Sequence, residues 1–394
     1  MTDKYRVQVL NHVSARGLRR LPWERFAVSA EIDEPHAILL RSADLHARPI
    51  PESVLAVGRA GSGTNNIPVA LLSQRGVPVF NAPGANANAV KELVLAGMLL
   101  AARNLDRALP YVTEQTGDDP DLEAKIEAGK KSFAGYELAG HTLGVVGLGK
   151  IGCLVADVAI KLGMHVIGYD PDITVEAAWS LPSSVKKAHS LGEILRHSNF
   201  LTVHVPLVDA TRGMIDAGAV AQMKRGAVVL NFSRGGVVDD AAVLEALVEG
   251  QLSRYVCDFP ASHLMGRPGV ILLPHLGAST GEAEENCAVM VADQVRDYLL
   301  DGTIRHAVNF PDVELPRESP WRIAIANANV PNMVGGISHE LASAGLNIAT
   351  MTNKSRGDLA YTIVDVDSDV PEPVVKAIET IDGVLMVRYL PQPA

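Results

Sequence analysis

One glycine pattern constrains the fold of this chain more than any other feature. Gly147, Gly149 and Gly152 directly follow the apolar run 142–146 and precede a stretch with helical spacing that ends at Gly163. A strand, a Gly-x-Gly-x-x-Gly turn and a helix in this order are typical of a dinucleotide-binding βαβ unit, because the glycines permit a tight turn and the approach of a pyrophosphate. A glycine-rich turn without a ligand is the alternative, and the flanking elements favour the dinucleotide.

The next predicted strand indicates which nucleotide binds. Asp170 ends this strand eighteen residues after Gly152, where a carboxylate can bond both ribose hydroxyls. No arginine follows to hold a 2′-phosphate, so the sequence predicts NAD rather than NADP. An Asp-Pro pair can also be a simple turn cap, which stays an open alternative. The predicted cofactor contacts are Gly147, Gly149, Lys150, Ile151, Gly152, Asp170, His204, Val205, Pro206, Ser233, Asp258 and Gly277.

Apolar runs alternate with helical patterns along most of the chain, as in α/β proteins with parallel sheets. We predict two doubly wound, Rossmann-like lobes: a substrate-binding domain (1–88 and 281–308) and an NAD-binding domain (89–280). One long apolar helix from about 89 to 109 leaves the first lobe. The predicted strands of the lobes are 6–10, 37–40, 54–57, 77–80, 142–146, 165–169, 200–204, 227–232, 255–257 and 270–273.

The C-terminal part, residues 318–394, follows a proline-containing linker and has its own pattern. Its predicted order is βαββαβ, the ferredoxin-like split unit. The strands are expected at 322–328, 347–353, 359–365 and 384–389, and the helices at 333–344 and 372–380.

Charge and cysteine content exclude several classes of function. A formal net charge of -10 argues against nucleic acid and anionic membranes as partners, so an anionic substrate needs a local basic pocket. The 3 cysteines have no metal-ligand spacing, which predicts reduced thiols in a cytoplasmic protein without a metal site. The longest apolar helical run, 93–102, is too short to span a membrane.

Polar residues follow the predicted strands at the carboxyl ends, where parallel sheets bind ligands. His275 is our candidate acid/base, because an imidazole can accept a hydroxyl proton near neutral pH. Arg234 is our candidate for orienting a carboxylate and polarising a carbonyl. Each residue alone is equally compatible with a structural role, but their shared position behind a cofactor turn favours hydride transfer from a 2-hydroxy acid.

Several longer motifs match one known family. They are VGRAGSG at 57–63, the glycine turn with Tyr169-Asp170-Pro171, NFSRGGVVD at 231–239, PHLGAST at 274–280 and VNFP at 308–311. With these motifs nearly the whole chain resembles the D-2-hydroxyacid dehydrogenase family, and within it the branch that oxidises 3-phosphoglycerate. The βαββαβ unit resembles an ACT regulatory domain.

The resemblance implies oxidation of 3-phosphoglycerate to 3-phosphohydroxypyruvate with NAD, in a cleft between the two lobes. It implies the roles given above for Arg234 and His275, and places Asp258 near the nicotinamide amide. It also implies a substrate-binding set in the first lobe, although an arbitrary arginine is usually a solvated surface residue. This set is Arg41, Ser42, Arg59, Gly61 and Asn86.

One departure from the family concerns the catalytic histidine. The family has a glutamate five residues after the position of Asp258, where it orients the catalytic imidazole. Here His263 stands there, or Ser262 if Phe259-Pro260 sets the register. Since a neutral imidazole can only accept a hydrogen bond and a charged one repels, we expect the acidic limb of the kcat/KM profile at lower pH.

The ACT-like unit suggests an amino-acid effector and an oligomer. Asn329 and Asn347 match effector positions of ACT domains and Asn327 is a further effector candidate, which implies L-serine as an effector and a homodimer or homotetramer. Asn332 replaces the usual glycine and Asn327 a more usual histidine. A purely structural dimerisation module is the alternative.

Two other functions remain open at the level of sequence. One is a glyoxylate or hydroxypyruvate reductase of the same family, whose substrate has the carboxylate and carbonyl but no phosphate. Neutralising Arg41 and Arg59 distinguishes the two functions, because only a phosphorylated substrate should then lose most of its affinity. An NAD-sensing scaffold that resembles corepressors of this fold is the second, because the expected glutamate is missing.

Overall fold

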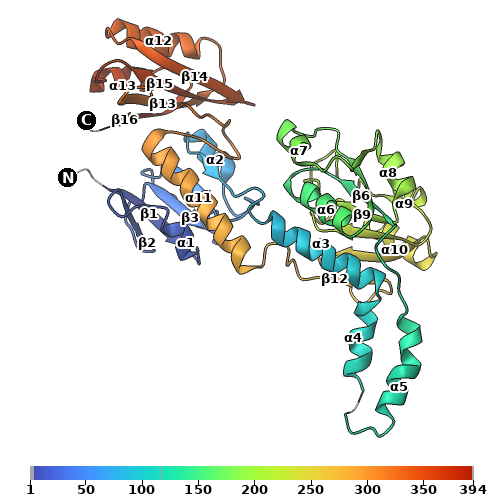
Figure 1. The fold of residues 1–394 in the computed structure, drawn as a ribbon. Coiled ribbons are helices and arrows are strands. Elements are labelled where there is room, and N and C mark those ends of the chain that lie inside the picture. Colours follow the sequence, from blue (N-terminus) through green and yellow to red (C-terminus); the bar gives the residue numbers. More distant parts are fainter. Residues whose placement is uncertain (1–3, 116, 393–394) are drawn as a thin grey trace. The chain divides into compact units, whose positions relative to one another are not determined.

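The computed structural model describes residues 4–115 and 117–392, which form two compact units. Unit 1 joins the chain up to Asn86 to the chain from Gly281 onward, and unit 2 is Ala87–Thr280. Unit 1 contains a parallel sheet and an antiparallel sheet, and unit 2 contains one parallel sheet (Figure 1). The predicted fold class, two Rossmann-like lobes with a C-terminal ferredoxin-like unit, is confirmed.

Unit 2 is built on a seven-stranded parallel sheet in the order β12-β11-β10-β9-β6-β7-β8. Apolar side chains alternate between its faces, so Leu143 and Val145 pack with α3 and α6 while Val146 packs with α8. Continuous apolar strands are expected of a sheet that is covered on both faces. The strands are β6 Thr142–Val146, β7 His165–Tyr169, β8 Lys186–Lys187, β9 Phe200–Val203, β10 Ala227–Asn231, β11 Leu252–Cys257 and β12 Val270–Leu272. The helices around the sheet are α3 Ala87–Ala102, α6 Lys150–Lys161, α7 Val175–Ser180, α8 Leu191–His197, α9 Ala217–Ala221 and α10 Asp240–Val248.

The strand order of unit 2 changes direction between β6 and β9. From β6 the chain proceeds through β7 and β8 on one side and then crosses to β9 on the other. Gly147, after β6, lies against His204, after β9: a Cβ on Gly147 would be 2.7 Å from the His204 carbonyl oxygen. Ligands of open parallel sheets bind at such a switch point, so the glycine turn occupies the expected position.

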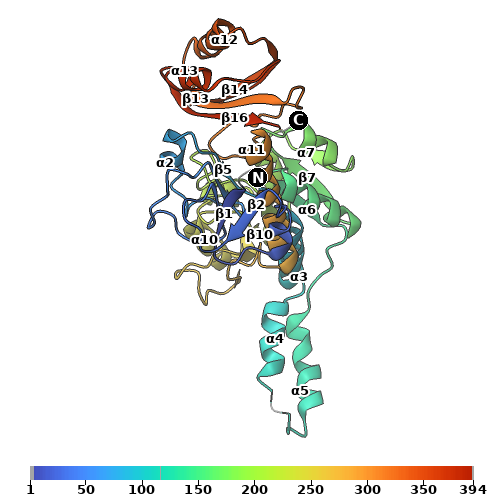
Figure 2. The same cartoon turned by 90° about the vertical axis from the view of Figure 1, so that its left-hand side faces the viewer.

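The prediction of one continuous helix from 89 to 109 is wrong, because the structure divides this segment into two helices. Helix α3 ends at Ala102 and α4 (Leu105–Thr113) begins after Asn104, whose φ of 51° is left-handed. Asparagine tolerates a left-handed φ. The Arg254 guanidinium donates to the side-chain oxygen of Asn104 at 2.7 Å. Helix α5 (Leu122–Gly129) runs beside α4, and the two form an arm of unit 2 (Figures 1 and 2).

The parallel sheet of unit 1 has the order β2-β1-β3-β4-β5. Its main covering helix is α11 (Gly281–Asp301), which packs so close to β4 that a Cβ on Gly58 would lie 2.6 Å from Val291. The strands are β1 Tyr5–Leu10, β2 Phe26–Ser29, β3 Ala37–Leu40, β4 Ala56–Arg59 and β5 Val79–Phe80, and the short helices are α1 Ala15–Leu18 and α2 Val69–Gln74.

The antiparallel sheet of unit 1 is the predicted βαββαβ unit, in the order β14-β15-β13-β16. Helices α12 and α13 cover one face (Figure 1). The strands are β13 Trp321–Ala328, β14 Ile348–Arg356, β15 Leu359–Val366 and β16 Val384–Pro391, and the helices are α12 Met333–Ser343 and α13 Glu372–Glu379.

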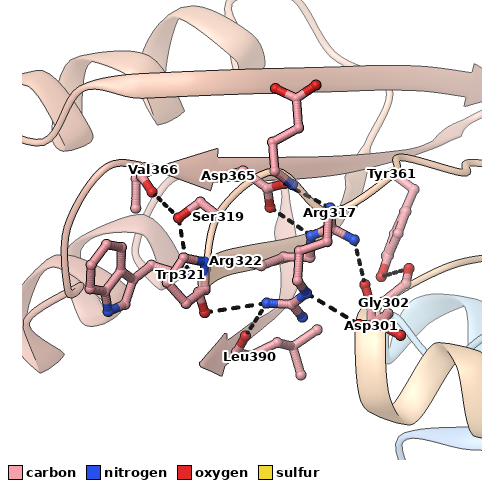
Figure 3. A network of polar contacts seen from close by, with 12 residues as sticks. Asp301, Gly302, Arg317, Ser319, Trp321, Arg322, Tyr361, Asp365, Val366 and Leu390 are labelled. Atoms are coloured by element: carbon pink, nitrogen blue, oxygen red, sulfur yellow. Dashed lines mark hydrogen bonds and ion pairs between the residues drawn. The ribbon is translucent and has the colours of Figure 1, made fainter. Parts of the chain in front are cut away.

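The other face of this sheet packs onto the end of α11. Arg388 is buried there and donates to the carbonyl oxygens of Tyr298 and Leu299 at 2.8 and 2.7 Å, which ties the sheet to the last turn of the helix. Figure 3 shows the neighbouring network, in which Arg322 donates to both carboxylate oxygens of Asp365 at 2.6 and 2.8 Å. The ACT-like sheet and the first lobe therefore share one hydrophobic core.

Two absences hold for residues 4–115 and 117–392. None of their helices is both long and apolar enough to cross a membrane. They also contain no group of three or more histidine, cysteine or acidic side chains arranged to hold a metal ion.

Candidate functional site

Each glycine of the turn after β6 has a different physical role. Gly147 has a left-handed φ of 89°, which favours glycine. A Cβ on Gly152 would lie 2.0 Å from the Gly147 carbonyl oxygen, so the helix can pack this close only without a side chain. A Cβ on Gly149 would meet nothing within 4 Å. The backbone at Gly149, where α6 begins without a side-chain cap, is therefore open to a phosphate group.

Asp170 at the end of β7 accepts a hydrogen bond from the backbone of the glycine turn. One carboxylate oxygen accepts from the Leu148 N–H at 2.8 Å, and the other accepts from the Asp172 N–H at 3.0 Å. The turn-cap alternative is thus realised in the structure. Each carboxylate oxygen keeps a second lone pair, which can accept from a ribose hydroxyl. The structure is therefore compatible with the ribose contact, which stays a prediction.

His204 at the end of β9 is held as a neutral imidazole. Its Nε2 lies 2.9 Å from the Thr202 hydroxyl, and its Nδ1 is buried without a hydrogen-bond partner among the described residues. Burial lowers the pKa of His204 to about 3. The following Val205 also packs against the glycine turn, where its Cγ1 would be 3.0 Å from a Cβ on Gly147, and Pro206 is exposed.

Arg234 lies on the loop after β10, which Asn231 organises. The buried Asn231 amide donates to the Arg234 carbonyl at 3.0 Å and accepts from the Ser233 N–H and hydroxyl at 3.2 and 3.1 Å. The Arg234 guanidinium donates to the Ser233 carbonyl at 2.7 Å and is exposed. Sequence reasoning missed Asn231, although a polar residue at the end of an apolar strand could have indicated it.

His275 has a backbone conformation that requires support. Its φ of 59° is left-handed, which is uncommon outside glycine and is concentrated at functional sites. The buried Asp258 carboxylate accepts from the next two backbone N–H groups, Leu276 and Gly277, each at 2.8 Å. The ring of Phe259 packs on the imidazole with centroids 5.0 Å apart. Asp258 thus fixes the backbone that follows His275, and Phe259 packs against its exposed imidazole.

His263 pairs with a carboxylate that the sequence did not single out. Its Nε2 lies 2.9 Å from Asp240 Oδ2, and the Tyr255 hydroxyl donates to the other oxygen of Asp240 at 3.3 Å. Within the described residues, no hydrogen bond joins His263 to His275, and the His275 imidazole has no hydrogen-bond partner. His263, one of the two candidates for the position of the family's glutamate, therefore bonds Asp240 here.

Unit 1 brings together the two arginines predicted to bind substrate. Arg59 donates from Nε to the Arg41 carbonyl at 3.0 Å and from NH1 to the Gly63 carbonyl at 2.6 Å. Gly61 makes room for it, because a Cβ there would lie 2.8 Å from NH1. The Arg41 guanidinium forms an ion pair with Glu284 of α11 at 2.7 Å. Of the remaining predicted contacts in unit 1, Ser42 is exposed and Asn86 is half-buried.

The three candidate effector residues lie at both ends of the ACT-like sheet. Asn329 donates to the Gly357 carbonyl at 3.0 Å, beside the β14–β15 hairpin. Asn327 is buried, with a side-chain oxygen that has no partner among the described residues. Asn347 lies at the opposite end, where its N–H donates to Asp367. The length of β15, roughly 24 Å for seven steps, separates Asn347 from Asn329 within one chain.

Comparison with known protein families matches part of this chain. The model described as "D-isomer specific 2-hydroxyacid dehydrogenase, NAD binding domain" matches residues 95–277. This segment contains the glycine turn, Arg234 and His275.

Relatives and solved structures extend the likeness to most of the chain. The D-3-phosphoglycerate dehydrogenase of Haemophilus influenzae is 32% identical, over 97% of this chain and 94% of that protein. The D-3-phosphoglycerate dehydrogenase of Escherichia coli is 31% identical, over 97% and 95%. The crystal structure of NAD+-bound 3-phosphoglycerate dehydrogenase from Entamoeba histolytica has a TM-score of 0.58 and 22% identity, over 78% of this chain and 99% of that one, which shows a shared fold.

Proposed function

Because the chain belongs to the D-2-hydroxyacid dehydrogenase family, we propose that it oxidises 3-phosphoglycerate to 3-phosphohydroxypyruvate, the first step of serine biosynthesis. It is an NAD-dependent oxidoreductase. The support for this substrate is that two dehydrogenases named for it align over nearly the full length of both chains.

The observation that carries the chemistry is the conformation of His275. The left-handed backbone of His275 is fixed by the buried Asp258 carboxylate, which accepts from the N–H groups of the next two residues, and a conformation held in this way supports a functional role. We assign His275 as the base that takes the proton of the substrate hydroxyl. Arg234 orients the carboxylate and stabilises the carbonyl oxygen as it forms.

The cofactor site uses the residues of the glycine turn. The open backbone at Gly149 and the start of α6 hold the pyrophosphate, and Asp170 holds the adenine ribose. Bound NAD supplies the acceptor for the hydride that leaves substrate C2. The chain's own residues contribute the proton acceptor and the fixed positive charge.

The phosphate of the substrate requires cationic groups in an acidic protein. Arg41 and Arg59 of unit 1 lie next to each other, and guanidinium groups suit phosphate oxygens. We assign them to the phosphate, with Ser42, Gly61 and Asn86 as further substrate contacts.

A rate assay of NADH formation tests the proposal. We expect turnover with 3-phosphoglycerate and NAD, and loss of most substrate affinity when Arg41 and Arg59 are both replaced by glutamine. Faster reduction of hydroxypyruvate or glyoxylate, unaffected by that double replacement, would support the reductase of the same family instead. NADH binding without turnover of any of these compounds would favour the sensing scaffold.

We further propose a cytoplasmic homodimer or homotetramer. The arm formed by α4 and α5 exposes Leu109 and Val112, which are 62% and 52% accessible and suit a protein contact. Within one chain, Asn329 and Asn347 lie at opposite ends of the ACT-like sheet. If L-serine is an effector that contacts both residues, the two must therefore come from different chains. Size-exclusion chromatography with light scattering, with and without L-serine, tests both proposals.

A further inference from the structure

We propose that Glu284 tunes the affinity of the arginine pair for phosphate by competing with the ligand for Arg41. The inference rests on the proposed function, in which Arg41 and Arg59 hold the phosphate of the substrate. It assigns a role in substrate specificity to a residue of α11 that has no part in the hydride transfer.

The Arg41 guanidinium contacts a full negative charge, since its NH2 lies 2.7 Å from Glu284 Oε1. Arg59 donates to the backbone carbonyls of Arg41 and Gly63, which places it beside Arg41. An incoming phosphate must therefore displace the Glu284 carboxylate or bind beside it.

The position of Glu284 makes the competition effective. It lies in the first turn of α11, and the side chains of Arg41 and Glu284 are 36% and 35% accessible, so an anion can reach the pair. Burial raises the pKa of the Cys287 thiol on the same helix, the charges of Arg41 and Arg59 oppose that shift, and the charge of Glu284 adds to it.

The charges in this cluster favour a weaker phosphate site than two arginines alone would make. Two guanidinium groups and one carboxylate leave one net positive charge. A phosphate that carries nearly two negative charges is repelled by the carboxylate at short range, although solvent screens part of that repulsion. An unphosphorylated hydroxy acid, which does not use the arginine pair, is not affected by Glu284.

The neighbouring residue provides a matched control. Glu285 is also in the first turns of α11 and also forms an ion pair, with Arg16 at 2.8 Å. Glu285→Gln removes the same charge from the same helix and breaks a comparable pair, but leaves the contact between Arg41 and Glu284 in place.

The test uses inorganic phosphate as the probe, titrated calorimetrically into the full-length protein without NAD. We expect Glu284→Gln to lower the Kd for phosphate by about 3- to 10-fold and Glu285→Gln to leave it within about 2-fold. In an Arg41→Gln background, Glu284→Gln should give a smaller gain, because there is no competition for Arg41 and only the direct repulsion of the phosphate is removed. With 3-phosphoglycerate as substrate, the gain should appear in KM, and glyoxylate should show no gain.

Equal or weaker phosphate binding in Glu284→Gln would overturn the inference, because it would mean that Glu284 only positions Arg41. The calorimetric measurement does not depend on turnover. If 3-phosphoglycerate is not oxidised, the proposed function fails while the phosphate titration still decides the role of Glu284. Thermal unfolding of each variant verifies that it is folded.

Discussion

His263 Nε2 lies 2.9 Å from Asp240 Oδ2, and this contact joins the loop after β11 to the first residue of α10. The resemblance implies a glutamate at the position of His263 or of Ser262 that orients the catalytic imidazole, whereas here His263 bonds the Asp240 carboxylate. His275 is instead supported through its backbone and by the ring of Phe259. This difference predicts a testable pH behaviour.

Replacing His263 by glutamate should move the acidic limb of kcat/KM for 3-phosphoglycerate oxidation toward higher pH, by about one unit. A carboxylate that bonds the imidazole of His275 favours its protonated form, and the base must then be deprotonated at higher pH. Because Asp240 would repel a glutamate at 263, the same replacement in an Asp240→Asn background is the control and should shift at least as far. A limb that does not move in either variant would contradict the prediction.

Replacing Asp258 by alanine should reduce both activity and stability. The change leaves the N–H groups of Leu276 and Gly277 without acceptors, which costs about 2–4 kcal/mol, and frees the backbone of His275 to relax. We expect kcat to fall at least about 100-fold, because misplacing a catalytic group by about 1 Å has that effect. Steady-state kinetics and urea unfolding measure the two effects, and Asp258→Asn, which keeps one acceptor, should lose less of each. Unchanged kcat in the alanine variant would exclude a supporting role.

Two alanine replacements in the glycine turn should separate ligand binding from folding. Gly149→Ala adds a Cβ with no atom within 4 Å, so the melting temperature should stay the same while NADH binds about 10-fold or more weakly. Gly152→Ala places a Cβ 2.0 Å from a carbonyl oxygen and should destabilise the protein by about 2 kcal/mol or more. Thermal unfolding and fluorescence titration with NADH measure the pair. Equal effects of both variants on stability would argue against this division.

His204 should make the folded state sensitive to acid. Its pKa is lowered to about 3 in the folded state, so the unfolded chain, with an ordinary histidine, binds a proton first as the pH falls. The contribution is complete above about pH 6.5 and declines toward pH 3, with a loss of up to about 2 kcal/mol at about pH 5. Urea unfolding at about pH 7.5 and about pH 5 measures this, and His204→Gln should reduce the difference. An equal difference in the variant would show that other groups are responsible.

Much of the fold could be predicted because its signals are local. Apolar runs, helical spacing and glycine turns placed most strands of both parallel sheets and every element of the βαββαβ unit within a few residues. The strands β2 and β8 were missed because they lie at sheet edges and are short, and β8 consists only of Lys186 and Lys187. Pairing with a neighbour, not residue type, makes such segments strands.

The amino-acid sequence by itself determined the glycine turn, the alternation of strands and helices, and the candidates Arg234 and His275, since each depends on residues close together in the chain. Only the tertiary structure decided which side chains these residues meet. Arg41 pairs with Glu284, which is far away along the chain, and His263 pairs with Asp240, 23 residues before it. Such contacts arise when elements pack, so no local pattern specifies them, and they determine how charge is distributed around the proposed site.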